Sequence, residues 1–364
     1  MTLSTFSAEG SASLGGPDWL RQRRAAGFEA FSSTPLPSET EEVWRYSPID
    51  QLALDDFAPA VDGPSGGDAA AGRALLESLR GALGHTAASV LVHGGRAVDS
   101  TWTGAANGAA TALSFGPADD VGASADMLGT VQRGGDALVR LNDAFMVDPV
   151  FVDVAAGATV DAPVLVVHWC EPGAAAFPRT VVRAGEGATV SVVEVFAGPD
   201  GAARSLVVPV TELSAGDGAS VSYVSLQVLP DSAWSIARLA ACGGGDSSVR
   251  TFTVGLGAAY DRIRTDVTVD GRDARSEILS AYLGDGAQVH DIRTLQDHAA
   301  PKTTSELLCQ GAVAGRSRSV YSGLIRVHRG AVRSDARQTN HNLVLDEGAH
   351  ADSVPNLDIL ENDV

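Results

Sequence analysis

The spacing of apolar residues changes near Met146. Before that point, apolar residues recur every three or four positions in three stretches, 17–34, 67–83 and 124–145. This spacing places apolar side chains on one face of a helix. The pattern therefore predicts three amphipathic helices in the first part of the chain.

Shorter features separate these stretches. The polar segment Pro37–Glu42 is typical of a helix N-terminus, so it predicts a further helix that includes Trp44. The stretch 57–67 is rich in Pro, Gly and Asp and predicts a linker. A strand is predicted at 89–92.

After Asp148 the chain is rich in valine, and no helical pattern separates the apolar runs. Runs of β-branched residues between turn-forming residues predict short strands. The predicted strands are 150–154, 164–169, 180–182, 189–196, 205–210, 220–228, 247–254, 262–269, 275–283, 288–295, 303–308, 316–328 and 338–345.

Gly-Ala pairs precede several of these strands. They begin at Gly157, Gly187, Gly218, Gly286 and Gly348, and the first three are 30 and 31 residues apart. A glycine accepts the left-handed backbone of a sharp corner, and coils of similar length stack on one another. The repeat favours a parallel β-helix over the alternative, a β-sandwich whose hairpins begin with Gly-Ala.

The sequence thus predicts a mainly β protein in three parts. Residues 1–60 form an N-terminal helical segment, 61–147 a mixed α/β region and 148–364 the β-helix. A length of 364 residues supplies enough material for more than one such part.

Charge and cysteine content narrow the classes of function. The net charge of −19 argues against nucleic acid as a partner. Cys170, Cys242 and Cys309 are far apart and form no CxxC pair, which is typical of a reducing compartment. No apolar run has the length of a signal peptide or a membrane span, so we expect a cytoplasmic protein without a membrane partner.

Several side chains are candidates for chemistry. Adjacent coils of a β-helix could gather metal ligands from the last third of the chain, although a histidine without HxxxH or CxxC spacing is more often a turn or surface residue. Those candidates are His290, His298, Cys309, His328, His341 and His350. His168 and Cys170 would share one face of a strand, either as an activated thiol or, more commonly, with the cysteine as a small buried apolar residue.

The sequence contains no nucleophile elbow of the GxSxG type, no P-loop and no HExxH motif, so it assigns no catalytic residue and no metal ligand set. A groove of acidic residues is an open alternative, but aspartates at strand ends more often form turns. Its members would be Asp261, Asp266, Asp270, Asp273, Asp285 and Asp291. The aromatic cluster Trp44–Tyr46 is expected to fix the N-terminal helices to the main body.

A set of short motifs resembles the SufB/SufD family of iron-sulfur cluster assembly scaffolds. The resemblance runs from about Pro17 to the last residue and rests on the order of the motifs. They are Glu42-x-Trp44-Arg45-Tyr46, Leu141-Asn142-x-Ala144-Phe145, His298-x3-Lys302-Thr303-Thr304-Ser305, Tyr321-x-Gly323-x-Ile325-x-Val327 and Asp335-Ala336-x-Gln338-Thr339-Asn340.

The resemblance implies a right-handed parallel β-helix and a scaffold that is not an enzyme. Asn340 stands where SufB proteins carry a cysteine thought to receive sulfur, which favours the SufD-like branch. The implied partners are a SufB-like paralogue and a SufC-like ATPase. The chain alone would bind no cofactor, but a transient iron-sulfur cluster would lie at the interface with SufB.

Family members normally continue past the position of Val364 with a further strand and a helical domain that binds the ATPase. We therefore expect that domain to be absent from this chain. Gln338, Asn340 and Asn342 are candidates for the surface that pairs with SufB. The alternative is that stacked amides satisfy one another inside the coil.

Two rival functions remain open at this stage. A carbohydrate-active β-helix enzyme would need the aspartates from Asp261 to Asp291 to converge on one exposed groove. A SufB-like primary scaffold would need a sulfur-accepting cysteine, and Cys309 or Cys242 is the candidate.

Overall fold

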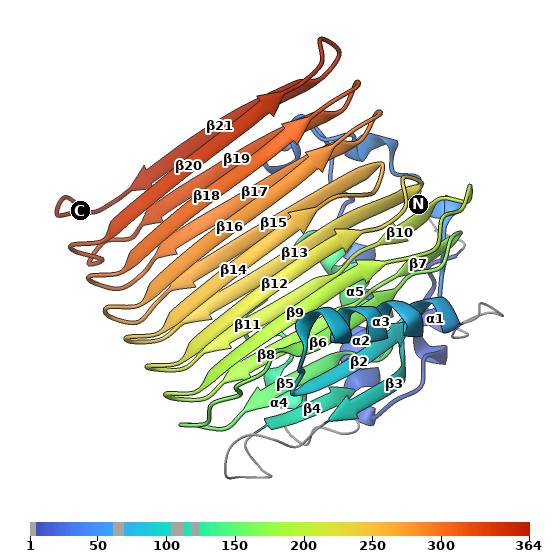
Figure 1. The fold of residues 1–364 in the computed structure, drawn as a ribbon, viewed down its shortest axis with the longest axis horizontal. Coiled ribbons are helices and arrows are strands. Elements are labelled where there is room, and N and C mark those ends of the chain that lie inside the picture. Colours follow the sequence, from blue (N-terminus) through green and yellow to red (C-terminus); the bar gives the residue numbers. More distant parts are fainter. Residues whose placement is uncertain (1–4, 61–68, 103–112, 118–123) are drawn as a thin grey trace.

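Two mainly parallel β-sheets face each other and form a β-solenoid of about seven turns (Figure 1). The computed structural model describes residues 5–60, 69–102, 113–117 and 124–364. The chain alternates between the two sheets, so each strand pairs in parallel with the strand one coil earlier and one coil later. The predicted parallel β-helix is confirmed.

Sheet A has twelve strands within the described residues. They are β1 (Ala58–Pro59), β4 (Leu113–Pro117), β5 (Val150–Val154), β7 (Ala174–Ala176), β8 (Arg179–Ala184), β10 (Ser205–Val207), β11 (Val210–Ala215), β13 (Ala233–Gly243), β15 (Tyr260–Val269), β17 (Val289–His298), β19 (Arg318–Val327) and β21 (His350–Ile359).

Sheet B has nine strands within the same described part of the chain. They are β2 (Ala88–His93), β3 (Arg96–Trp102), β6 (Val164–Trp169), β9 (Thr189–Ala197), β12 (Ser220–Val228), β14 (Ser248–Gly255), β16 (Arg275–Gly284), β18 (Thr304–Val313) and β20 (Asp335–Val344).

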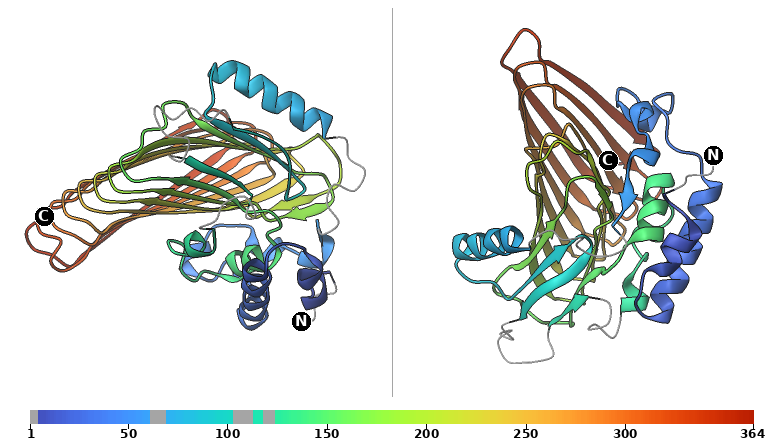
Figure 2. Two further views of the ribbon diagram at one scale, coloured as in Figure 1. Left: turned by 90° about the horizontal axis from the view of Figure 1, so that it is seen from below. Right: turned by 90° about the vertical axis from the view of Figure 1, so that its right-hand side faces the viewer.

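Helices cover the outer faces of the first coils on both sides (Figure 2). Helix α3 lies on sheet B against β2 and β6, and the other helices lie on the side of sheet A. The α-helices are α1 (Ala8–Ser13), α2 (Asp18–Ser33), α3 (Ala70–Leu83), α4 (Ser124–Met127) and α5 (Ala137–Phe145), and the 3-10 helices are η1 (Glu42–Trp44), η2 (Ile49–Gln51) and η3 (Leu54–Asp56).

Burial along the strands follows from this arrangement. In β16 every second side chain is buried, because alternate side chains of a strand point to the solenoid interior and to the outside. In β6 all six residues are buried, since α3 and neighbouring residues cover its outer face. The covered strands are therefore continuous apolar runs, and the uncovered strands alternate.

The core has two main parts. The larger one fills the solenoid interior, where valines of the first coils such as Val152, Val166 and Val182 are completely buried. The second joins the N-terminal helices to the outer face of sheet A. There Phe145 contacts Phe6 and Phe177, with ring centroids 5.3 and 5.8 Å away.

The corners from sheet A to sheet B form a continuous hydrogen-bonded ladder. Gly157, Gly187 and Gly218 have φ angles of 72°, 65° and 66°, and each donates its N–H to a carbonyl of the next coil. The repeat therefore predicted this corner correctly. In later coils the same left-handed position is held by non-glycine residues, namely Asp246, Asp273, Lys302 and Arg333.

The last two Gly-Ala pairs lie elsewhere. Gly286 is left-handed but stands at the opposite corner, between β16 and β17, and Gly348 follows β20 outside the left-handed region. The assignment of all five pairs to one repeat was thus wrong. Two kinds of corner share the same two-residue pattern.

Some local predictions also need correction. The segment after Pro37 forms only the 3-10 turn η1, and the predicted helix 124–145 is divided into α4 and α5. The predicted strand 205–210 ends early and continues as β11, because Pro209 has no N–H to donate to the sheet. Strands β1, β3, β4, β7, β13 and β21 were missed.

The predicted boundaries at residues 60 and 147 stay predictions. Strand β2 pairs in parallel with β6, β3 pairs antiparallel with β2, and β4 pairs antiparallel with β5. The middle part of the chain therefore continues both sheets beyond the first coil. Most of the predicted linker 57–67 lies outside the described residues, apart from a stretch that includes β1.

Candidate functional site

The last coil, β20 and β21, differs from the others because both strands lie at a sheet edge in the described structure (Figure 1). It also exposes large apolar side chains. The exposed fraction is 68% for Leu357 and 58% for Leu343. An edge with exposed apolar residues is a surface on which another strand can pair.

The three predicted interface residues lie on β20 of this coil, and their side chains face the space between β20 and β21. Asn342 Nδ2 donates to Asn340 Oδ1 and to Ser353 Oγ of β21, both at 2.9 Å. Tyr282 donates its hydroxyl to Asn342 Oδ1 at 2.5 Å. Gln338 Oε1 is buried, and the described residues offer it no hydrogen-bond partner.

The asparagines therefore satisfy part of their hydrogen-bonding capacity within the coil, as the alternative interpretation required. Whether the same residues pair with another protein is a separate question, and that role stays a prediction.

A column of polar side chains runs through the solenoid interior and ends at this coil. Parallel register places its members one above another along sheet B. They are Glu194, Ser225, Thr253, Ser280, Cys309 and Asn340. We call this set the polar column. It replaces the valine interior of the first coils.

Burial keeps the thiols protonated. It raises the pKa of Cys309 to about 12, only partly opposed by a hydrogen bond from Asn340, and raises the pKa of Cys170 to about 12. Burial also raises the pKa of Cys242. A thiol is a weak nucleophile when it is not ionised. Cys170 is therefore the small buried residue of the commoner interpretation, not an activated thiol.

Glu194, at the first level of the polar column, is a fully satisfied buried carboxylate. Its oxygens accept hydrogen bonds from Thr180, Thr211 and Tyr223 at 2.5–2.9 Å, and His168 Nε2 lies at 2.7 Å. Burial opposes its ionisation, but the hydrogen bonds and His168 outweigh that effect, so the pKa of Glu194 lies below its ordinary value.

Asp261 and His290 form a contrasting pair two coils further on. Both side chains are completely buried, and His290 Nδ1 lies 3.6 Å from Asp261 Oδ2. Within the described structure neither carboxylate oxygen nor either ring nitrogen has a hydrogen-bond partner. The Asp261 carboxylate packs against Gly255, where a Cβ would lie only 2.3 Å from Asp261 Oδ2.

The predicted metal candidates do not come together. His290 and His298 lie inside the solenoid, but His298 bonds to Thr303 and Ser305, both at 2.7 Å. His328 lies 2.8 Å from Asp297, His350 lies 3.0 Å from Asp352, and His341 is exposed. No group of three or more metal-ligating side chains occurs among the described residues.

The six aspartates of the proposed groove are also dispersed. Asp261 is inside the core, and Asp291 is buried under the segment around Trp44. Asp266 pairs with Arg238 and Arg264 on the outer face of sheet A. The remaining three lie in corners at opposite ends of β16. Asp270 and Asp273 are in the corner between β15 and β16, and Asp285 is in the corner between β16 and β17. The geometry that a carbohydrate-active groove requires is thus not met.

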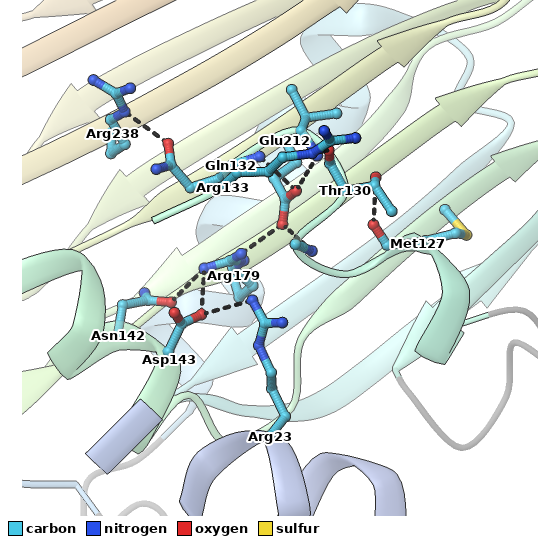
Figure 3. Close-up of polar contacts among 12 residues, drawn as sticks. Arg23, Met127, Thr130, Gln132, Arg133, Asn142, Asp143, Arg179, Glu212 and Arg238 are labelled. Atoms are coloured by element: carbon cyan, nitrogen blue, oxygen red, sulfur yellow. Dashed lines mark hydrogen bonds and ion pairs between the residues drawn. The ribbon is translucent and has the colours of Figure 1, made fainter. Parts of the chain in front are cut away.

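A buried ionic network joins the helices to sheet A (Figure 3). Arg179 donates to Glu212 at 2.5 Å and to Asp143 at 3.3 Å, and the Arg179 and Glu212 side chains are completely buried. Glu212 also accepts three backbone N–H groups from residues 129–132. Asn142 Nδ2 donates to the carbonyls of Pro178 and Val208. The pairing of β8 with β11 and the packing of α5 and the preceding segment on sheet A bring these residues together.

The cluster at Trp44 joins the N-terminal part to later coils, as predicted. The Arg262 guanidinium lies 3.7 Å from the Trp44 ring centre and donates to the carbonyl of Val43 at 2.5 Å. Arg293 donates to the carbonyl of Arg45 at 2.5 Å. Neither arginine stands out in the sequence, although both lie in predicted strands.

None of the described helices is both long and apolar enough to span a membrane.

Comparison with known proteins shows which family has a similar sequence. Residues 168–364, more than half of the chain, match the family model for the SUF system FeS cluster assembly SufBD core domain. An iron-sulfur cluster assembly SufBD family protein of Mycobacterium leprae is 35% identical over 128 residues, which are 33% of this chain and 33% of that protein.

Two further relatives are similar over different lengths. The iron-sulfur cluster assembly protein SufD of Escherichia coli is 32% identical over 109 residues, 30% of this chain and 26% of that protein. A SufBD family protein of Synechocystis is 25% identical over 357 residues, 95% of this chain and 78% of that protein. The chain spans about a third of the length of the mycobacterial relatives that it matches. Because the family model covers most of the solenoid, the chain belongs to the SufBD core domain family of the SUF iron-sulfur cluster assembly system.

Proposed function

We propose that this chain is a SufD-like scaffold subunit of a cytoplasmic SUF-type complex that assembles iron-sulfur clusters. It pairs with a SufB-like paralogue, works with a SufC-like ATPase and catalyses no reaction of its own. The observation that carries this proposal is the family match over 168–364, which contains the solenoid from β7 onward.

Two features support the SufD-like role over a SufB-like one. Asn340 occupies the place at which, by resemblance, SufB proteins carry a sulfur-accepting cysteine. The neighbouring Cys309 is paired in register with Asn340, but it is buried and its raised pKa keeps it protonated. A side-chain amide cannot form a persulfide, and a protonated thiol forms one slowly.

We assign the pairing surface to the last coil, with Gln338, Asn340 and Asn342 as members. The position of Asn340, which by resemblance is that of the sulfur-accepting cysteine in SufB proteins, supports this assignment. An iron-sulfur cluster is then cargo held transiently at the interface with the paralogue, and this chain alone binds no cofactor.

Co-purification tests the proposal. The tagged chain is co-expressed with the SufB-like and SufC-like proteins of its own genome, and we expect a stable complex on size-exclusion chromatography. Leu357→Asp should reduce recovery of the SufB-like protein, whereas Leu283→Asp, at an exposed leucine on the outer face of sheet B, should not. Recovery of neither partner would contradict the proposal.

Sulfur transfer distinguishes the two branches. The complex is supplied with sulfur by its cysteine desulfurase and digested for mass spectrometry. We expect persulfide on the SufB-like subunit and none on this chain. A persulfide on Cys309 or Cys242 would favour the role of primary scaffold instead.

A further inference from the structure

A small pocket of about 160 Å³ lies where the segment before α5 meets the outer face of β13 and β15. Four arginines line it, together with Gln132 and the Trp44 ring. They are Arg133, Arg238, Arg262 and Arg264. Figure 3 shows Arg133 and Arg238 on either side of Gln132. In a chain with a net charge of −19, this concentration of positive charge is unusual.

Negative charge is scarce in the wall of the pocket. Asp136 is the one carboxylate among the described lining residues, and it is already engaged, because Oδ1 accepts the N–H groups of Leu138 and Val139 at the start of α5. The carboxylates that pair with the arginines, Asp266 and Asp291, are outside the lining. The guanidinium charges are therefore compensated mainly by carboxylates outside the lining, with Asp136 as the one contribution from the pocket wall.

The arginines also retain free donors. Arg238 uses Nε for Gln132 and one terminal nitrogen for Asp266, and Arg264 uses Nε and one terminal nitrogen for Asp266. Arg133 uses Nε for the carbonyl of Thr130. A guanidinium has five N–H donors, so each of these three has N–H groups without a partner among the described residues.

Positive charges face one another across the pocket. Burial lowers the pKa of Arg238 and the nearby Arg264 lowers it further, whereas Asp266 and Asp136 oppose that effect. At Arg262 burial is outweighed by Asp291, and the pKa is raised. An anion between the arginines would relieve this repulsion and accept charge-assisted hydrogen bonds from their planar donor groups.

We propose that this pocket binds a small oxyanion of the phosphate class. The volume accommodates a tetrahedral group with a few water molecules, whereas pockets for whole nucleotides or similar ligands measure roughly 300 to 1,000 Å³. The site includes Trp44 of the N-terminal part and Arg238 of the solenoid. A bound anion therefore strengthens the junction between these two parts.

Titration calorimetry of the full chain tests this site, with inorganic phosphate and phenyl phosphate as probes at constant ionic strength. We expect saturable binding at one site for at least one probe. Arg264→Gln and Arg133→Gln should each weaken it about tenfold or more, since a hydrogen bond to a charged group contributes roughly 1.5–3 kcal/mol. The probe that binds more tightly identifies a free anion or an esterified phosphate as the ligand.

Arg250→Gln is the matched control, because Arg250 is an exposed strand arginine that pairs with Glu277 on the other sheet. It should bind phosphate like the unchanged chain. Arg133 is exposed, so its variant should fold, and circular dichroism verifies this. Absence of saturable binding to both probes, or equal weakening in Arg250→Gln, would overturn the proposal.

Discussion

The first and the last coils of the solenoid share one backbone plan but differ in what fills and covers them. From β5 to β12 valines fill much of the interior, the buried polar residues around Glu194 are hydrogen-bonded to one another, and helices cover outer faces of the first coils (Figure 2). From β15 to β21 the interior contains Asp261, His290 and the end of the polar column, and the outer faces of β16, β18 and β20 are partly or fully exposed. The first coils are built for stability.

The last coils differ in their buried polar atoms. Buried polar atoms without partners cost free energy, so a structure retains them mainly where another function requires them. In the described part of the chain such atoms are concentrated in the later coils, including both oxygens of Asp261, Thr265 Oγ1, Gln296 Oε1 and Gln338 Oε1. The described unsatisfied polar atoms of the solenoid thus lie mainly toward its C-terminal end, which also holds the predicted interface residue Gln338.

Charge pairs should show the largest difference between the two regions. Arg179 is completely buried between Asp143 and Glu212, so Arg179→Ala should lower the free energy of unfolding by about 3–5 kcal/mol. Arg326 pairs with Asp358 at 2.9 Å on an open face, and Arg326→Ala should cost about 0–1 kcal/mol. Urea denaturation measures both. Equal costs would mean that the helical cover does not isolate the first coils from water.

Buried carboxylates give the next contrast. Glu194 accepts hydrogen bonds from four side chains, and Glu194→Gln should cost about 2–3 kcal/mol at neutral pH, because an amide nitrogen would face donors. Asp261→Asn should cost less than about 1 kcal/mol, since Asp261 has no hydrogen bond to lose within the described structure.

The pH dependence of the Glu194 effect has a definite sign. The pKa of Glu194 is lowered in the folded protein, so its contribution to stability is present above the ordinary value of 4.5 and is lost as the pH falls through the folded value. The difference between the unchanged chain and Glu194→Gln should therefore shrink below about pH 4.5. A difference that stays constant into acid would show that the ionised carboxylate is not what stabilises this network.

Isosteric exchange of valine and threonine tests the interior directly. Val182 is surrounded in its column by Val152 and Leu213, so Val182→Thr should cost about 1–3 kcal/mol by burying a hydroxyl without a partner. Thr265 already has such a hydroxyl, and Thr265→Val should be neutral or stabilise by about 1 kcal/mol. Thermal unfolding compares the two. A loss on Thr265→Val would indicate that water or a ligand satisfies that hydroxyl.

The same contrast decided which elements could be predicted. The predicted bounds of β5, β6 and β12 agree with the structure, because their valine-rich sequences have high strand propensity. Strand β13 was missed because alanine replaces the β-branched residues, and pairing with β11 and β15 supplies its order. Strand β21 was missed because it is polar and contains Pro355, which a sheet edge tolerates.

The site was less predictable than the fold. Gln338, Asn340 and Asn342 were identified from a local segment, but their contacts to Ser353 and Tyr282 depend on the register of other strands. The polar column joins residues about one coil apart, and coil lengths vary. No single spacing in the sequence therefore reveals it. The Arg179 network likewise depends on residues 33 or more positions away.

Substitutions at the corners should have the smallest and most local effects on stability. Gly187 has a φ of 65°, and a Cβ there would meet only Gly157 Cα, at 4.0 Å, so Gly187→Ala has room but a strained backbone. It should lower stability by about 1–2 kcal/mol.

Asp246 holds the same corner in a later coil with a φ of 54°. Asp246→Gly should change stability by no more than about 0.5 kcal/mol, because the relieved strain offsets a more flexible unfolded chain. If Gly187→Ala were as mild as Asp246→Gly, backbone conformation would not explain the glycines, and the repeat in the first coils would need another cause. A larger cost for Gly187→Ala than for Asp246→Gly would mean that the left-handed corner glycines stabilise the first coils in addition to their buried valines. In the later coils the same corner already accepts residues with side chains.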